Sequence, residues 1–267
     1  MTFYALEVGA PDLETLQRRV RAAEAAGYAF VTFPDDPLRG GIEAGVRAAF
    51  LARRTSRIGL APTLHTTTTE PFHLATQLAS LDHASLGRAG WVVGATTDPA
   101  ALATVGRTAV DPAEVADVVD VARQLWDSWE DDAIIRDVPT GRFLDPAKVH
   151  HVHFDSDRFS IVGPLITTRP PQGQVVVIGA AALGLTDRLD VVVVEPGEAA
   201  PPGEALVFAS VSAAELSTLD RPLDGVLIRD DGGELPAVPH PSTAATLREA
   251  LGLDRPVNRF APAWSTR

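Results

Sequence analysis

Eight short runs of β-branched and apolar residues constrain the fold more than any other feature of the sequence. Each run is almost entirely apolar, the pattern of a strand buried on both faces of a parallel sheet. The runs are Tyr4–Val8, Phe30–Phe33, Ile58–Leu64, Ala89–Val93, Val175–Ile178, Val191–Val194, Leu206–Phe208 and Val226–Ile228. No internal repeat of fixed period accompanies them, which excludes solenoids and propellers. They therefore predict eight parallel strands.

Helical patterns with start and stop signals separate several of these runs. Asp12 is placed to cap a helix that Gly27 is suited to end. A second helix is expected after Pro71, and Asp111–Glu114 combines a capping residue with a proline at the first helical position. A last helix is expected from about Ser242 to Leu251.

Strands that alternate with helices over 267 residues predict an α/β fold. The size and pattern are those of a compact (β/α)8 TIM barrel, formed by one domain over residues 1–267, with a doubly wound open sheet as the alternative. The joints around strand 6 are short, and Pro196, Pro201 and Pro202 are incompatible with the interior of an α-helix. We therefore expect shortened or missing helices between strands 5 and 7.

The longest joint lies between strands 4 and 5. It contains an apolar stripe from Val115 to Trp129 and then a hairpin pattern at about 149–163, which turns at residues 155–157. A chain that leaves a barrel helix lies at the N-terminal ends of the strands. We therefore expect this hairpin insertion on the face opposite a barrel's usual active site.

The charge balance narrows the classes of partner. Lys and Arg number 23 against 35 Asp and Glu, a formal net charge of −12, and the basic residues form no cluster, so neither nucleic acid nor an anionic membrane is an expected partner. The chain has no Cys, which excludes disulfides, thiolate metal sites and cysteine nucleophiles. With neither a secretory leader pattern nor a run of about 20 apolar residues, the expected location is cytoplasmic.

Two stretches resemble one known enzyme family. One extends from Leu51 to Val93 and contains LHTTTTEPFHLATQLASLDHASLGRAGW. The other extends from Gln124 to Ala180 and contains the unusual strings LWDSW, GPL and PPQG. These strings resemble the bacterial luciferase-like flavin monooxygenases, and the stretch 124–180 is similar to the branch that includes nitrilotriacetate and dibenzothiophene-sulfone monooxygenases. The similarity covers roughly residues 28–180.

The resemblance implies an FMN-dependent monooxygenase built on a (β/α)8 barrel. In this family a separate flavin reductase supplies reduced FMN, which reacts with dioxygen and transfers oxygen to a small-molecule substrate. The protein binds and orients the cofactor and excludes water. Members of the family often form homo-oligomers.

The residues that match the family's flavin site follow the C-terminal ends of the strands, where barrel active sites lie. The resemblance implies cofactor-binding roles for Asp35, Thr63, His65, Thr66, Trp91, Thr96, Gly179 and Ala180. His65, which stands where the family has a serine, is the candidate catalytic residue because an imidazole exchanges protons at neutral pH. The alternative for His65 is a partly buried side chain bonded to a neighbouring loop.

Four positions depart from the family pattern. Val92 stands where the family has an asparagine near the flavin, and Pro112 where it has a tyrosine. After strand 5, Ile178 replaces a glutamine and Ala182 replaces a serine that approaches the flavin phosphate. One lost charge-assisted hydrogen bond costs about 1.5–3 kcal/mol. Together these replacements predict weak, altered or absent flavin binding.

Two functions therefore remain open. The chain is either an FMN-dependent oxygenase or a non-catalytic barrel that acts as a binding or partner subunit. Glu7, Glu195 and Arg229 end strands 1, 6 and 8, and they are either ligand contacts or charges on the rim. The histidines at positions 150, 151 and 153 have no nearby acid to complete a metal site, so none is predicted.

Overall fold

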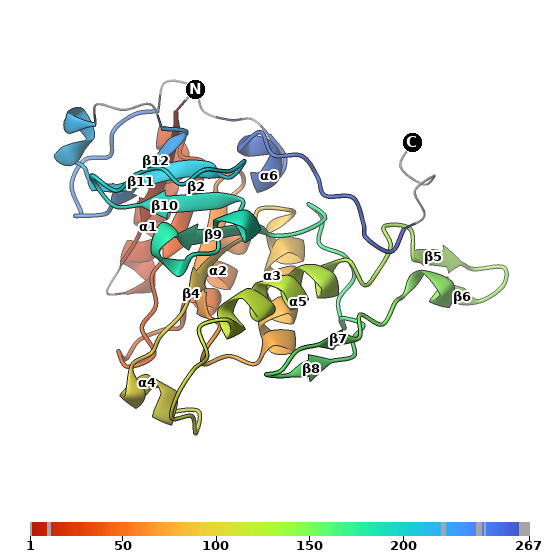
Figure 1. The fold of residues 1–267 in the computed structure, drawn as a ribbon. Helices are drawn as coiled ribbons and strands as arrows, with labels where there is room; N and C mark the ends of the chain where they lie inside the picture. Colours follow the sequence, from red (N-terminus) through yellow and green to blue (C-terminus); the bar gives the residue numbers. More distant parts are fainter. Residues whose placement is uncertain (1, 10–11, 220–222, 239–241, 243, 262–267) are drawn as a thin grey trace.

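Eight parallel strands close into a barrel in the computed structural model (Figure 1). The structure describes residues 2–9, 12–219, 223–238, 242 and 244–261. In the order in which they pair around the barrel, the strands are β1 (Phe3–Glu7), β12 (Gly225–Arg229), β11 (Leu206–Ser212), β10 (Val191–Val194), β9 (Val176–Ala180), β4 (Gly90–Gly94), β3 (Gly59–His65) and β2 (Phe30–Phe33). All eight predicted runs form these strands. The barrel prediction is confirmed, and the open-sheet alternative is wrong.

Five α-helices lie between β1 and β9 in the described chain, and they cover only the first half of the barrel. They are α1 (Leu13–Ala26), α2 (Ala44–Ala52), α3 (Pro71–Ser85), the short α4 (Pro99–Ala103) and α5 (Glu114–Trp126). Asp12 caps α1 by accepting a hydrogen bond from the Thr15 backbone N at 2.8 Å. Gly27 ends α1 with φ 92°, a left-handed conformation that favours glycine. Asp12 and Gly27, the predicted start and end signals, therefore mark the two ends of α1.

The second half of the barrel has short turns in place of helices. Over residues 181–205, all of which the structure describes, only the 3₁₀ turns η2 (Ala181–Leu183) and η3 (Thr186–Arg188) form, followed by the proline-containing loop before β11. Another 3₁₀ turn, η4 (Glu215–Thr218), lies between β11 and β12. The predicted compression between strands 5 and 7 is confirmed.

Side chains fill the inside of the barrel and a short helix closes its N-terminal end. Phe30 and Phe208 are fully buried there, with ring centroids 5.5 Å apart. Leu247 of α6 (Leu247–Ala250) packs against Gly59 and Gly90, and a Cβ added to Gly59 would lie 2.6 Å from Leu247 Cδ1. The predicted last helix is shorter than expected because its capping box begins at Thr246, so residues 244 and 245 precede the helix and residue 243 lies outside the described part.

Two hairpins leave the barrel between α5 and β9. They are β5 (Ile134–Asp137) with β6 (Arg142–Leu144), and β7 (Phe154–Asp155) with β8 (Ser160–Ile161), joined by the 3₁₀ turn η1 (Pro146–Lys148). The β7–β8 pair is the predicted hairpin, but its expected position is wrong. Its turn lies near the start of α5, because Arg158 bonds Asp111 and Asp117, each at 2.9 Å. The strands run back along α5 toward the mouth of the barrel (Figure 1).

Candidate functional site at the barrel mouth

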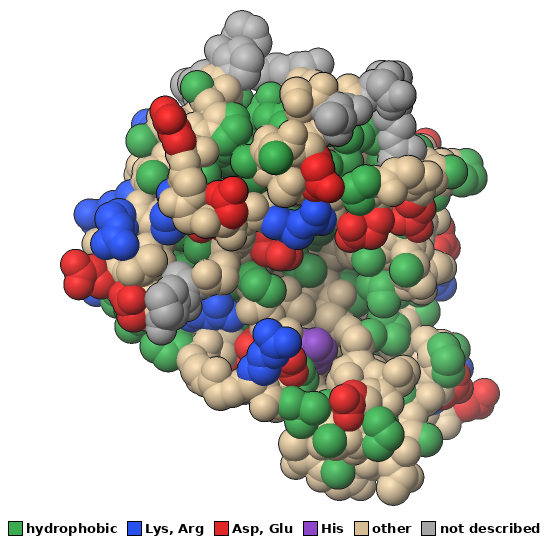
Figure 2. All heavy atoms as spheres, turned by 90° about the vertical axis from the view of Figure 1, so that its left-hand side faces the viewer, with side chains coloured by type: hydrophobic (Ala, Val, Ile, Leu, Met, Phe, Trp, Pro, Cys, Tyr) green, Lys and Arg blue, Asp and Glu red, His purple; other side chains and the backbone are tan. Residues whose placement is uncertain are grey.

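Strand alternation decides which side chains reach the C-terminal mouth of the barrel. Ala5 and Phe30 pair across β1 and β2 and belong to the inner cluster of buried residues. Glu7 and Thr32 pair two residues further on, so they share that inner face. The left-hand side of Figure 1 is seen face-on in Figure 2, which shows a hollow near the centre with a histidine side chain beside it. The mouth is therefore the candidate site.

Charged side chains surround Arg229 at the end of β12. Its Nη1 donates to the backbone O of Ser210 at 3.1 Å and to Ser210 Oγ at 2.8 Å, and its Nη2 donates to Glu215 Oε2 at 3.0 Å. Glu195 Oε2 lies 3.6 Å from Arg229 Nη1. Glu215 in turn accepts hydrogen bonds from the backbone N and Oγ of Ser212. Arg229 is thus held in one position by partners on two neighbouring segments.

Glu7 and Thr32 lie side by side on the inner face of the mouth. Burial raises the pKa of Glu7; Arg229 opposes this shift and Glu195 adds to it. None of the described residues donates a hydrogen bond to the Glu7 carboxylate. Thr32 is 2% exposed, and its Oγ1 has no hydrogen-bond partner in the described part of the chain. A carboxylate and a hydroxyl thus face the inside of the mouth with unused hydrogen-bonding capacity.

His65 lies at the end of β3, the strand that pairs with β2. Its Nε2 lies 3.2 Å from the backbone O of Asp35, and its buried Nδ1 has no partner among the described residues. A Cβ on Gly94 would lie 3.0 Å from the His65 ring and 3.0 Å from Thr63 Cγ2. The mouth therefore does bring Thr63 and His65 together, packed over the glycine. Their proposed contact with flavin stays a prediction.

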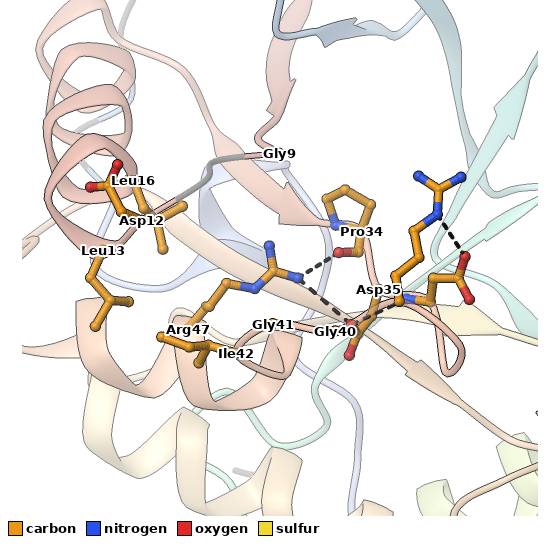
Figure 3. Close-up of a pocket in the computed structure, with 12 residues that line it drawn as sticks. Gly9, Asp12, Leu13, Leu16, Pro34, Asp35, Gly40, Gly41, Ile42 and Arg47 are labelled. Carbon is orange, nitrogen blue, oxygen red and sulfur yellow. Dashed lines mark hydrogen bonds and ion pairs between the residues drawn. The ribbon is translucent and has the colours of Figure 1, made fainter. Parts of the chain in front are cut away.

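Asp35 organises the loop after β2 rather than reaching into the mouth. Its carboxylate accepts hydrogen bonds from the backbone N of Asp36 at 3.1 Å and of Ala44 at 3.0 Å, and Arg47 lies 3.9 Å away. Behind this loop is a cavity of about 420 Å³ against the start of α1, lined by Asp12, Asp35 and Arg47 among others (Figure 3). The Asp35 side chain is thus already used to fix the start of α2.

Three other predicted cofactor residues point away from the mouth. Trp91 is fully buried on the outer face of β4, where its Nε1 donates to the backbone O of Leu64 at 3.1 Å and its ring meets Trp126 edge-on at 6.4 Å. Thr66 is 1% exposed and donates to the backbone O of Gly94 at 3.0 Å. A Cβ on Gly179 would meet Leu189 on the outer side of β9. Strand alternation turns positions 91 and 179 outward, and Thr66, which follows β3, bonds to the backbone of β4.

The segment after β9 does not fit the flavin phosphate. Ala180 ends the strand and precedes η2, a turn of three residues, so no α-helix begins here to direct its N-terminus at an anion. Ala182 within this turn is exposed and has no hydroxyl. Thr96, the remaining predicted residue, lies in the loop after β4, where its N donates to Thr67 Oγ1 at 3.0 Å. None of these residues forms a phosphate cradle.

The wall formed by β4 and β9 offers no polar contact to a flavin ring. Val92 and Ile178 pair across these strands, and Ile178 is fully buried inside the barrel. The partly buried Val193 packs against the same inner cluster. Apolar side chains thus occupy the two strand positions where the resemblance implies polar ones. The residues present on β4 and β9 do not fit FMN.

The structure also reveals mouth residues that the sequence did not single out. Thr32 lies within the buried run Phe30–Phe33, where a threonine is an ordinary strand residue. Ser210 and Glu215 become recognisable only when β11 and η4 are seen beside Arg229. A polar residue inside an otherwise apolar strand was the one available signal.

The histidines on the hairpin segment have protein partners. His150 Nε2 lies 2.8 Å from Glu130 Oε1 and its ring stacks on Phe260, while His151 Nδ1 lies 2.7 Å from the backbone O of Gly163. Among the described residues, no three His, Asp or Glu side chains come together as a metal site. No helix in the described part of the whole chain is long and apolar enough to cross a membrane.

Comparisons with known proteins agree with this architecture. A model of the family described as luciferase-like monooxygenase matches residues 3–188. The chain is 35% identical to one of the subunits of pristinamycin IIA synthase of Streptomyces pristinaespiralis, over 94% of this chain and 93% of that protein. It is 45% identical to N-acetyl-S-(2-succino)cysteine monooxygenase of Bacillus subtilis, over 50% of this chain but only 32% of that enzyme.

Solved structures show the same fold. EDTA monooxygenase from Chelativorans sp. BNC1 superposes with a TM-score of 0.75 at 17% identity, over 95% of this chain and 99% of that chain.

The two sequence relatives differ in how much of their length is matched. The chain spans nearly the whole length of the pristinamycin synthase protein, but only about a third of the length of the Bacillus monooxygenase.

Proposed function

The chain belongs to the luciferase-like monooxygenase family, and we propose that it is the smaller subunit of an FMN-dependent monooxygenase. In this proposal a longer luciferase-like subunit holds reduced FMN, which a separate reductase supplies, and oxygenates a small molecule. The present chain completes the assembly without holding the flavin itself.

The observation that carries this proposal is the mismatch between the mouth and FMN. The three-residue turn after β9 offers no helix N-terminus to the phosphate, and Val92 and Ile178 offer no hydrogen bond to the ring. The protein that this chain matches over nearly its whole length is, by its name, a subunit. Both facts favour the partner-subunit function over an independent oxygenase.

An apolar groove between α2 and α3 offers a surface for the longer subunit. The groove encloses about 270 Å³, and none of the described residues that line it carries a charge. Val46 on its edge is 54% exposed, and small residues such as Ala49 and Ala84 let another helix approach closely. An exposed apolar surface of this kind is typical of protein interfaces.

The first test is an anaerobic titration of the purified chain with reduced FMN, followed by absorbance. We expect no saturation up to about 1 mM, which corresponds to binding weaker than about 4 kcal/mol. The second test mixes the chain with a longer luciferase-like monooxygenase from the same organism and measures the assembly by sedimentation. Saturable micromolar binding of reduced FMN by the chain alone refutes the partner-subunit proposal and supports the independent oxygenase.

A matched pair of variants tests the groove. Val46→Glu places a charge on the groove and is expected to prevent assembly with the longer subunit. Val138→Glu makes the same change on the β5–β6 hairpin, where Val138 is 88% exposed, and is expected to leave assembly intact. Equal effects of the two substitutions contradict the assignment of the groove.

A further inference from the structure

We propose that the barrel mouth binds a small organic cation, a primary ammonium with an apolar body, between Glu7 and Thr32. The residues concerned lie on β1, β2, β11 and β12, on the other side of the mouth from the flavin positions of β4 and β9. The proposal goes beyond the subunit function and holds for the chain alone.

The charge of the mouth favours a cation. Among the described residues, three carboxylates, those of Glu7, Glu195 and Glu215, lie around the guanidinium of Arg229. Arg229 already donates to Ser210 and Glu215 from its two terminal nitrogens, so it has little capacity left for an anionic ligand. With all four groups ionised, these described side chains together carry more negative than positive charge.

Glu7 is the carboxylate that a ligand would reach. Arg229 lies close enough to lower the pKa of Glu7, but no ion pair within 4 Å joins them among the described residues. Burial raises the pKa of Glu7, which shows that the protein itself stabilises this carboxylate less well than water does. A bound cation supplies the missing compensation.

Thr32 provides an independent sign of a ligand. Its side chain is buried and its Oγ1 has no partner among the described residues, although buried hydroxyls normally have a hydrogen-bond partner. The register of β1 and β2 places Thr32 directly beside Glu7 on the inner face. An ammonium group has three N–H donors, and it can therefore donate to the Glu7 carboxylate and to Thr32 Oγ1 together.

The rest of the inner wall suits an apolar body. Val92, Ile178 and Leu227 belong to, or pack against, the inner apolar cluster. The half-buried Val92 and Val193, which pack against this cluster, are the apolar side chains that a ligand with its charged end at Glu7 would meet on the far side of the mouth. Ammonium compounds with a short alkyl chain match both features.

Isothermal titration calorimetry of the purified chain with n-hexylamine, 1-hexanol and hexanoate tests the proposal. These probes share one alkyl chain and differ in the charge of the head group. We expect n-hexylamine to bind at least tenfold more tightly than the other two. Equal affinities, tighter binding of hexanoate, or no binding of n-hexylamine up to about 10 mM (under roughly 3 kcal/mol) overturns the proposal.

Three variants locate the binding. Glu7→Gln is expected to weaken n-hexylamine binding about ten- to a hundredfold, the effect of one charge-assisted hydrogen bond. Thr32→Val keeps the shape and is expected to weaken it about three- to tenfold. Glu204→Gln, at an exposed residue before β11 at the other end of the barrel, makes the same charge change as a control and is expected to have no effect.

These variants separate site binding from general attraction to an acidic protein. Equal losses in Glu7→Gln and Glu204→Gln mean that net charge alone attracts the amine, and they refute the site. Thermal unfolding of each variant verifies its fold. A failure of this test leaves the flavin titration and the assembly test unaffected, because neither uses Glu7 or Thr32.

Discussion

Replacement of Asp190 by asparagine is expected to lower the free energy of unfolding by about 3–5 kcal/mol. Asp190 stands just before β10, where it ties three segments together. Its carboxylate accepts hydrogen bonds from both terminal nitrogens of Arg248, each at 3.1 Å, from Arg123 Nη2 at 3.1 Å and from the backbone N of Val177 at 2.8 Å. The side chains of Arg248 and Asp190 are only 5% and 14% exposed.

The size of the effect follows from what the substitution leaves behind. Asparagine has one acceptor oxygen and no charge, so two largely buried guanidinium groups lose their counter-ion while remaining out of water. Breaking a buried pair in this way costs far more than the net value of the pair, because the remaining charge is uncompensated. For a domain of this size, about 2–4 °C per kcal/mol converts this loss into a fall of roughly 6–20 °C in the unfolding temperature.

Urea denaturation of Asp190→Asn beside Asp132→Asn measures this loss. Asp132, 72% exposed, pairs with Lys148 at the surface, and its substitution is expected to cost less than about 1 kcal/mol. Burial alone would raise the pKa of Asp190, but Arg123 and Arg248, with the hydrogen bonds to the carboxylate, outweigh burial and hold the pKa below its ordinary 3.8. The stabilisation by Asp190 is therefore present above that pH and is lost as the pH falls toward the lowered value. The difference between wild type and Asp190→Asn should therefore be constant from about pH 5 to 8 and narrow below about 4. A loss under about 1 kcal/mol for Asp190→Asn refutes the reasoning.

Three further outcomes are expected. Glu7→Gln should make the protein more stable at pH 7, because burial raises the pKa of Glu7 and the ionised carboxylate therefore destabilises the fold. This gain in stability should disappear as the pH falls below about 4.5. If urea denaturation at pH 7 shows the variant to be less stable than the wild type, burial does not destabilise the Glu7 carboxylate. Burial raises the pKa of Asp82 to about 6. As the pH rises from 4 to 7, the free energy of unfolding of the wild type should therefore fall by roughly 2–3 kcal/mol relative to that of Asp82→Asn. Calorimetry measures this difference, and stability profiles that stay parallel over this pH range contradict the raised pKa. Trp126→Phe removes the hydrogen bond from Nε1 to the backbone O of Ala75 and leaves a gap, so unfolding should become easier by about 2–4 kcal/mol with no change in n-hexylamine affinity; a loss of affinity would link this contact to the mouth.

The fold was predictable wherever neighbours in sequence decide the structure. The strand β2 and the caps of α1 follow from apolar runs and from the chemistry of Asp12 and Gly27. The position of the β7–β8 hairpin was not predictable. It depends on Arg158 reaching Asp111 and Asp117, which lie 47 and 41 positions earlier in the chain.

The candidate site was only partly predictable for a related reason. The sequence identifies His65 and Glu7 as residues at strand ends, but it does not say which side chains turn inward. Trp91 turns outward into the packing against Trp126, whereas Thr32 turns inward beside Glu7. Alternation along a strand is known from sequence, while its phase relative to the barrel axis depends on pairing around the whole barrel.

The closure of the barrel by α6 makes residues far apart in the gene mutually dependent. Leu247 occupies the space that side chains on Gly59 or Gly90 would need: a Cβ on Gly59 would lie 2.6 Å, and one on Gly90 3.3 Å, from its methyl carbons. A Cβ on Gly59 would also lie 2.8 Å from Phe30 Cβ, so a larger residue at position 59 requires both a smaller residue at position 247 and a shift of β2. A smaller residue at position 247 alone leaves a void. We therefore expect the two glycines and the leucine to covary among relatives, and such covariation would report the closed end of this barrel.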